Sequence, residues 1–361
     1  MIPVLYGAFE KTFANNGLGG LPNATSCTVT EKRNTPGGYY LEMDYPIDGL
    51  HYADIINERI IYASPAPKEK PQPFRINRVS RPINGIVHIE APHVSSEMLK
   101  IVAHGTVTSN KPQDIFNAFA QATRTEGQTV DFTMYSDKTF DNSATVSFPV
   151  PTDLFSVLVG AEGSIIDKFG GELFFDGWNV WWHENRGENR GLEIRYGVNM
   201  NDIESETDSS ELVTAVLPYW VGDVNGVETV VVGSICFSDN ASSFAYIRAI
   251  PLDVSSEFDG NTTPTALEIT NKGLAFIGKT ELKNLSMSTQ VKYTPTTLGI
   301  GDRPIYLCDT VKVVHPDLKV ANTAKVVETK YNVLAERYDE LTIGSIKQSI
   351  VDTIAKMIKK G

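Results

Sequence analysis

The chain has 361 residues and a formal net charge of −12; 41% of its residues are hydrophobic and 21% are charged. This length favours two or three compact units, and the composition is that of a folded globular protein, not of a disordered or fibrous one. The negative charge, with lysines dense only at the C-terminal end, would repel a phosphate backbone, so we expect no nucleic-acid binding.

The sequence also argues against secretion and against membrane insertion. No stretch approaches the roughly 18 apolar residues of a membrane span, and the N-terminus lacks a signal-peptide pattern. The three cysteines, Cys27, Cys236 and Cys308, show no paired spacing. We therefore expect a protein made in the cytosol, with all three cysteines as small core residues and no cofactor.

The first 92 residues have mostly β patterns. Alternating apolar residues predict strands at residues 39–45, 55–62, 74–79 and 85–90. A proline-rich stretch at 65–73 predicts a surface loop, because proline cannot donate to a strand ladder. We expect one β-domain over residues 1–92.

A helical insertion is expected over residues 93–152. Apolar residues recur with helical spacing at 94–99, behind the caps Ser95 and Ser96, and again at 115–120. These two short helices interrupt the β pattern, which resumes in the next segment.

Residues 153–205 are expected to start a second β-domain. A helix is predicted at 165–169, stopped by Gly170, followed by strands at 172–175, 178–183 and 192–196. The acidic stretch 201–211 is predicted to be an exposed loop.

A second insertion is expected over residues 206–282, with strands within 229–237 and a helix at 266–275. Residues 283–345 then complete the second β-domain, with strands at 291–293, 305–314 and 324–331.

The last segment, 346–361, is predicted to be an amphipathic helix. Its apolar residues fall on one helix face, and we assign a candidate oligomer contact to Ile346, Ile350, Ile354 and Met357. The stripe suits packing on the chain's own body or contact along a symmetry axis. A membrane-surface helix is a third alternative without other support.

No motif supplies a catalytic set. His88 and His93 flank a His-x-Glu-x-x-His run, but zinc-binding helices place their histidines four residues apart, and Pro92 interrupts this segment. Asp176 and Gly177 are better explained as a hairpin turn than as part of a glycosidase signature. We therefore expect no metal site and no enzymatic activity.

Three tryptophans form the main aromatic cluster. If residues 178–183 are one strand, Trp178 and Trp182 share a face and Trp181 lies on the other. At least one indole would then be exposed, where it could stack on a sugar or contact a partner protein. Packing in a core or interface is the alternative interpretation.

A series of short motifs resembles a known family. Its main part lies within residues 163–197 and includes Asn185-Arg186-Gly187. Further pieces occur in the same order along the chain: Asp44-Tyr45-Pro46 with Asp48-Gly49, Gln72-Pro73-Phe74-Arg75-Ile76, Ala91-Pro92-His93-Val94-Ser95, Pro218-Tyr219-Trp220, Leu307-Cys308-Asp309-Thr310-Val311 and Ala324-Lys325-Val326-Val327. The series is similar to the phage minor structural proteins often called prophage tail endopeptidases. The resemblance covers nearly the whole chain.

The resemblance implies an architecture and a function. The fold would be α+β and mainly β, with two tube-like β-barrel domains and two α/β insertions, similar to contractile-tail baseplate hub proteins. The protein would be the homotrimeric hub at the virion tail tip of a phage or prophage of Gram-positive bacteria, assembled in the host cytoplasm. Its partners would be the distal tail protein ring, the tail tube and the tape-measure protein.

Two other functions stay open at this point. The family name and the tryptophans suggest a peptidoglycan hydrolase or peptidase as one alternative, although no catalytic residue can be carried over to this chain. A saccharide-binding module acting through Trp178, Trp181 and Trp182 is the second alternative.

Overall fold

The computed structural model describes residues 1–195, 200–208, 213–224, 227–239, 241–258, 263–279, 288–295, 304–315 and 320–344. The chain divides into two compact units. The first contains Met1–Glu204 and Val291–Gly344, and the second contains the described residues of Ser205–Gln290.

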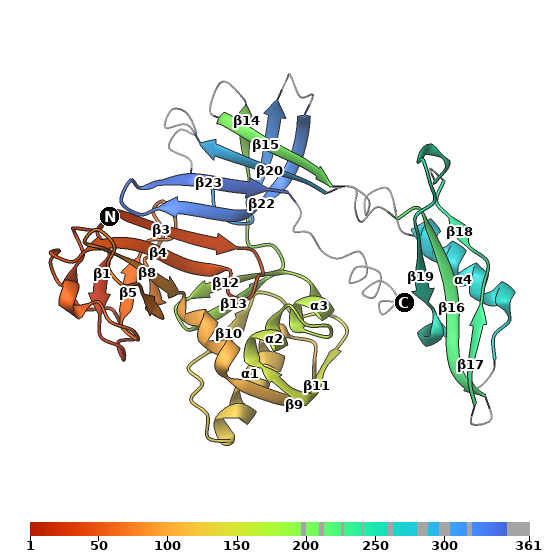
Figure 1. Cartoon of the computed structure of the whole chain (residues 1–361). Helices are drawn as coiled ribbons and strands as arrows, with labels where there is room; N and C mark the ends of the chain where they lie inside the picture. Colours follow the sequence, from red (N-terminus) through yellow and green to blue (C-terminus); the bar gives the residue numbers. More distant parts are fainter. Residues whose placement is uncertain are drawn as a thin grey trace. The chain divides into compact units, whose positions relative to one another are not determined.

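The main sheet of the first unit has ten strands. Their course can be followed in Figure 1. Its continuous path consists of β15 (Met200–Asp208), β20 (Ser288–Pro295), β23 (Arg337–Ile343), β22 (Val320–Asn332), β3 (Ser26–Lys32), β4 (Tyr39–Pro46), β8 (Ile86–Pro92) and β7 (Arg78–Val79). Strand β21 (Thr310–His315) pairs with β22 and, in parallel, with β14 (Asn189–Arg195). In β4, Tyr39, Leu41, Met43 and Tyr45 are buried and alternate with half-buried residues, because successive side chains point to opposite faces.

A smaller sheet shares the core of this unit. Its order is β2 (Gly19–Gly20), β1 (Val4–Tyr6), β5 (Ile60–Ala63) and β6 (Gln72–Arg75). Leu5, Ile61 and Phe74 of this sheet belong to the same buried cluster as Leu41 and Tyr45 of the main sheet. One continuous apolar core therefore supports both sheets.

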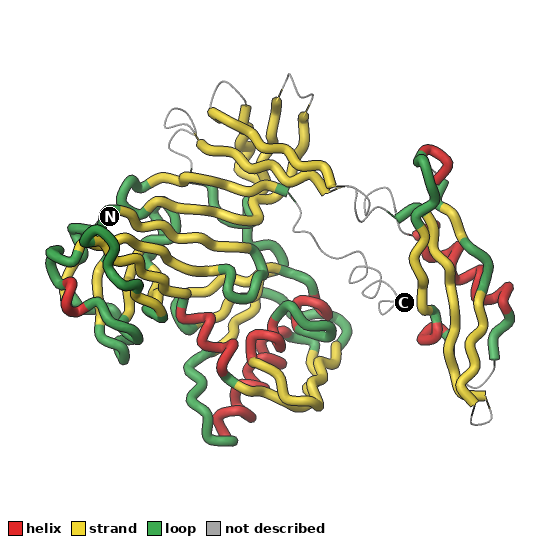
Figure 2. The backbone as a smooth tube through the Cα atoms, in the orientation of Figure 1, coloured by secondary structure: helices red, strands yellow, loops and turns green. Residues whose placement is uncertain are grey.

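Short helices and two further small sheets complete the first unit (Figure 2). The helices are η1 (Tyr52–Asp54), η2 (Val94–Lys100), α1 (Pro112–Thr125), α2 (Leu154–Leu158) and α3 (Ile165–Phe169). Strand β9 (Val102–Ser109) pairs with β11 (Ala144–Asp153), and β13 (Asn179–His183) lies between β10 (Thr133–Ser136) and β12 (Glu172–Asp176). Helix α1 begins at Pro112, whose fixed φ suits a first turn, and buries Ile115, Phe116 and Phe119.

The second unit is a small sheet covered by one helix. Strand β16 (Ala215–Val224) pairs with β17 (Val227–Val232), β18 (Cys236–Phe237) and β19 (Ala249–Asp253); η3 (Ala241–Ser243), η4 (Ser255–Glu257) and α4 (Ala266–Lys279) complete the unit. Its own core contains Val216 and Trp220 of β16 together with Ile269 of α4.

Most sequence predictions of elements hold, but several need correction. The strand predicted at 305–314 begins only at Thr310, and the surface loop predicted at 65–73 ends in β6, where Gln72 and Pro73 are buried. The helices at 115–120, 165–169 and 266–275 are confirmed, and α3 ends at Gly170 in a left-handed conformation, φ 69°. The strand predicted at 55–62 begins only at Ile60, because Glu58 adopts a positive φ of 73°. The strand predicted at 74–79 is divided between β6 and β7, and the one predicted at 229–237 between β17 and β18.

The exposed loop predicted at 201–211 also needs correction, because residues 200–208 form strand β15. Asp202, Glu204 and Glu206 alternate with Ile203 and Ser205, which is the period of a strand despite the polar composition. The acidic content alone gave the wrong prediction.

The broader fold class is confirmed: the chain is mainly β with few helices. The two tube-like barrels and the boundaries of the six predicted segments stay predictions. The C-terminal helix with Ile346, Ile350, Ile354 and Met357 lies outside the described residues. Cys27, Cys236 and Cys308 are buried free thiols, as expected of core residues. Within the described ranges, no helix has both the length and the apolar character needed to span a membrane.

Candidate functional site

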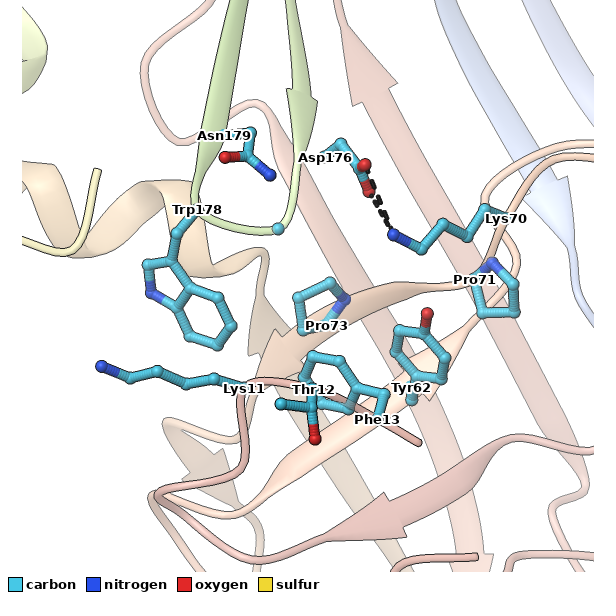
Figure 3. Close-up of a pocket in the computed structure, with 11 residues that line it drawn as sticks. Lys11, Thr12, Phe13, Tyr62, Lys70, Pro71, Pro73, Asp176, Trp178 and Asn179 are labelled. Carbon is cyan, nitrogen blue, oxygen red and sulfur yellow. Dashed lines mark hydrogen bonds and ion pairs between the residues drawn. The ribbon is translucent and has the colours of Figure 1, made fainter. Parts of the chain in front are cut away.

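A pocket of about 130 Å3 lies on the first unit, between segments that are far apart in the sequence (Figure 3). The loop after β1 contributes Lys11, Thr12 and Phe13. The turn between β12 and β13 contributes residues 176–179, and the strands β5 and β6 with the loop between them contribute Tyr62, Lys70, Pro71 and Pro73. The pocket therefore combines aromatic rings and prolines with a polar rim.

Glu10 organises the loop that carries Lys11, Thr12 and Phe13. Its carboxylate accepts hydrogen bonds from the Thr12 backbone N–H at 2.8 Å, the Thr12 hydroxyl at 2.7 Å and the Phe13 N–H at 3.1 Å. The Asn15 amide donates to it at 3.2 Å. These hydrogen bonds, led by those from Thr12, lower the pKa of Glu10 to about 2. The loop is thus held by an ionised carboxylate at any physiological pH.

Phe13 occupies a strained position beside the pocket. Its φ is 51°, in the left-handed region that costs a non-glycine residue about 1–3 kcal/mol. Its ring stacks on Tyr62 with centroids 4.4 Å apart and lies parallel to Trp178 at 6.3 Å. The packing of the ring and the hydrogen bonds to Glu10 hold this conformation in place.

Trp178 presents a ring face to the pocket. Gly177, at φ 58°, makes the turn before it and donates its N–H to the Gln72 side chain at 2.8 Å. The indole N–H donates to Glu97 at 3.1 Å, and Glu97 is held by Arg75 at 2.7 Å. Because the indole N–H is already bonded, the ring offers a ligand its π-face.

The rim of the pocket carries both hydrogen-bond donors and hydrogen-bond acceptors. Asp176 accepts from the Lys70 ammonium and from the Gln72 amide, each at 3.1 Å. Asn179 is exposed, and its amide lies above the aromatic floor in Figure 3. Lys11 lies 5.9 Å from the Trp178 ring centroid and pairs with Asp131 at 2.7 Å.

The other two tryptophans lie elsewhere. Trp182 is fully buried on β13, and its indole N–H donates to the Gly170 carbonyl at 3.0 Å. Trp181, 37% exposed, stacks on Tyr135 at 4.7 Å. The expected shared face of Trp178 and Trp182 is wrong, because β13 begins at Asn179 and leaves Trp178 in the turn.

A second polar cluster is structural. The Arg186 guanidinium pairs with Glu31 at 2.7 Å, and both side chains are about nine-tenths buried. Glu172 accepts from Lys325 at 2.6 Å, and Asp309 accepts from Arg190 at 3.0 Å. Gly187 packs so closely that an added Cβ would lie 2.0 Å from the Cys308 carbonyl oxygen. Sequence motifs more than 100 residues apart therefore meet in one network.

Glu69 lies beside this cluster and makes stability depend on pH. Burial, assisted by the nearby Glu31 carboxylate, raises the pKa of Glu69 from 4.5 to about 7. Between these values the folded state holds a proton that the unfolded chain has released, so stability falls as pH rises through this window.

We expect Glu69→Gln to raise the free energy of unfolding at pH 8 by about 2 kcal/mol, because the neutral amide avoids the cost of ionising a buried acid. At pH 4.5 the variant and the parent should be nearly equal. Urea unfolding at both pH values measures this; an equal change at both would show that ionisation is not the cause.

The histidines of the His-x-Glu-x-x-His run have separate environments. His88 contacts Asp44 at 2.8 Å, whereas His93 is fully buried and stacks on Tyr39. Burial lowers the pKa of His93 to about 3. Among the residues that the structure describes, no group of three or more His, Cys, Asp or Glu side chains is placed to hold a metal ion.

Comparison with solved structures places this architecture among phage tail proteins. The prophage tail protein gp18 of Listeria monocytogenes superposes with a TM-score of 0.60 and 15% identity, covering 100% of both chains. The 43 kDa tail protein of prophage MuSo2 from Shewanella oneidensis gives 0.58 at 10% identity, over 96% of this chain and 98% of that one. A tail protein of Neisseria meningitidis gives 0.55 at 7%, over 95% and 96%. The chain has the fold of a phage tail protein.

A protein-family model matches part of the sequence. Residues 188–354 match the family model described as prophage endopeptidase tail. No curated protein sequence matches the chain. The match includes residues 188–204 and 291–344 of the first unit, and therefore Asp309 and Lys325 of the buried network, as well as residues 205–290 of the second unit.

Proposed function

We propose that the protein is a structural component of the tail tip of a phage or prophage, the homotrimeric hub that closes the tail tube. The observation that carries the proposal is the agreement of fold with prophage tail proteins over nearly the full length of the chain. In this role it joins the tube to distal parts that recognise the host or penetrate its cell wall. The distal tail ring and the tape-measure protein are its expected neighbours in the virion.

The charged residues support a structural role. In the described part of the chain, the buried carboxylates Glu31, Glu172 and Asp309 are engaged by Arg186, Lys325 and Arg190. Such pairs hold segments in register and leave these three carboxylates unavailable for acid or base catalysis. The proposal is therefore of a protein without catalysis of its own.

The second unit offers a surface for contact between subunits. Helix α4 covers one face of its sheet, where Val216 and Trp220 are buried. By register, Leu217 and the pairs Tyr219–Val232 and Val221–Val230 face the other side. Val230 and Val232 are 54% and 49% exposed there. An apolar sheet face that the described residues leave exposed is typical of an interaction surface, and we assign it to a neighbouring copy of the chain.

Light scattering after size exclusion should give a mass about three times 39.7 kDa. Replacing Val230 and Val232 together with lysine should yield a monomer, because two buried ammonium groups would oppose association. Leu267→Lys on the exposed side of α4 is the matched control and should leave the trimer unchanged. A strictly monomeric parent chain at high concentration would count against the trimer.

Phage particles that lack the protein provide a direct test of its proposed role at the tail tip. Deleting the gene from the encoding phage should give tails without a closed tip, and antibody labelling of complemented particles should mark one end of the tail. The hydrolase alternative predicts instead that the purified protein releases muropeptides or new amino termini from bacterial cell walls. Either product from an otherwise pure sample would overturn the non-enzymatic role.

A further inference from the structure

We propose that the pocket around Trp178 binds a neutral pyranose ring of a saccharide. A pyranose has a face of C–H groups and an edge of hydroxyls, and the pocket has the matching arrangement. The face of Trp178, with Phe13, Tyr62 and Pro73, forms an apolar floor, and polar groups stand at one side of it (Figure 3). Aromatic faces beside a few convergent polar groups are the usual composition of small-ligand sites.

The rim favours hydroxyl groups over charged ligands. The Lys70 ammonium and the Asp176 carboxylate are paired at 3.1 Å, so donor and acceptor stand side by side without net charge. Neighbouring hydroxyls on a sugar donate to one such group and accept from the other. Lys11 is paired with Asp131 at 2.7 Å. Both lysines that line the pocket thus have carboxylate partners, which disfavours an anionic ligand.

Asn179 adds a third polar contact. Its exposed amide offers both a donor and an acceptor and lies beside Asp176 at the start of β13. The volume of about 130 Å3 is well below the about 300–1,000 Å3 of sites for drug-sized molecules. The pocket therefore suits one sugar ring, with the remainder of a glycan in solvent.

The pocket is formed before any ligand arrives. The Glu10 carboxylate fixes the loop through Thr12 and Phe13, and Phe13 is held at a φ of 51° against Tyr62. The indole of Trp178 is fixed by its bond to Glu97 at 3.1 Å. A ligand does not have to order these side chains, so even a single ring can bind measurably.

Saturation-transfer difference NMR on the full chain tests the proposal, with methyl β-D-glucopyranoside, methyl β-D-galactopyranoside and N-acetylglucosamine as probes. At least one probe should show saturation of its ring C–H protons. Asn179→Ala should weaken that binding about tenfold, the effect of losing roughly one good hydrogen bond. Trp178→Ala should abolish it.

Trp181→Ala is the matched control, because Trp181 is exposed but lies outside the pocket, and this variant should bind like the parent. The Asn179→Ala variant alters only an exposed side chain, so its folding is not in question. Absence of saturation with all three probes would overturn the proposal. So would binding that survives both pocket substitutions, or binding of acetyl-tetraproline amide in place of every sugar. These outcomes are independent of the oligomeric state that tests the hub.

Discussion

Replacing Arg186 with methionine is expected to lower the free energy of unfolding by about 3–5 kcal/mol. The guanidinium is buried and bonds Glu31 through Nη1 at 2.7 Å. Its pairing with Glu31 offsets the cost of burial and keeps the pKa of Arg186 high. Without it, the Glu31 carboxylate would be buried with no compensating charge. Urea unfolding at pH 7, followed by tryptophan fluorescence, gives the difference directly.

A second substitution separates the loss of pairing from a general loss of packing. Combining Arg186→Met with Glu31→Leu should recover much of the lost stability, because neither charge then remains buried alone. Arg78→Met is the matched control: it breaks an ion pair with Glu90 at 2.6 Å, but that pair is exposed and should change stability by under about 1 kcal/mol. A loss at Arg186 no larger than at Arg78 would contradict the proposed role of the network.

Elements with one clear period could be predicted from the sequence. In β4, Tyr39, Leu41, Met43 and Tyr45 alternate, and the structure buries these four. Pro112 and the helical spacing after it likewise located α1. In such segments the local pattern and the tertiary packing favour the same structure.

The strand pair β9 and β11 could not be predicted from a local sequence pattern. Its exposed positions carry hydroxyl residues that bond across the strands, Thr106 to Ser147 at 2.7 Å and Thr108 to Thr145 at 2.8 Å. A polar stretch of this kind has no strong apolar alternation, so residues 93–152 were predicted as a helical insertion. The strands form because they pair with each other, and a single segment does not encode that pairing.

The pocket could be predicted only in part from the sequence. Trp178 was identified as a candidate because it lies in an aromatic cluster, but Phe13 and Tyr62 have no local motif around them. They meet Trp178 only because β5, the loop after β1 and the β12–β13 turn lie together. The turn geometry also determines where each indole lies. Strand β13 starts at Asn179, one residue later than expected, so Trp178 lies in the turn and does not share a strand face with Trp182.

The buried network gives a physical reason for several of the resembling motifs. Arg186 and Gly187, Cys308 and Asp309, and Lys325 belong to three separate motifs of the chain. The backbone N–H of Glu188 donates to Asp309 at 2.8 Å, and the Cys308 N–H donates to the Val326 carbonyl at 2.9 Å. These motifs join distant segments of the first unit, so their presence indicates a shared fold and carries no implication of catalysis.

Trp182→Ala is expected to destabilise the first unit by about 3–5 kcal/mol, the usual cost of removing a large buried aromatic side chain. The ring fills the core beside Phe140, with centroids 5.6 Å apart, and its N–H satisfies the Gly170 carbonyl at 3.0 Å. The backbone has closed around it: a Cβ on Gly171 would lie 2.6 Å from the indole. The truncated side chain would leave both a cavity and an unpaired carbonyl.

The adjacent residue provides the control, since Trp181→Ala removes an equally large ring from the same strand. Trp181 projects to the opposite face, is 37% exposed and stacks on Tyr135 of the neighbouring strand β10. Its loss should cost about 1 kcal/mol or less, the worth of a partly exposed aromatic pair. Urea unfolding of the two variants under identical conditions measures the contrast. Equal losses would mean that β13 does not separate a core face from an exposed face.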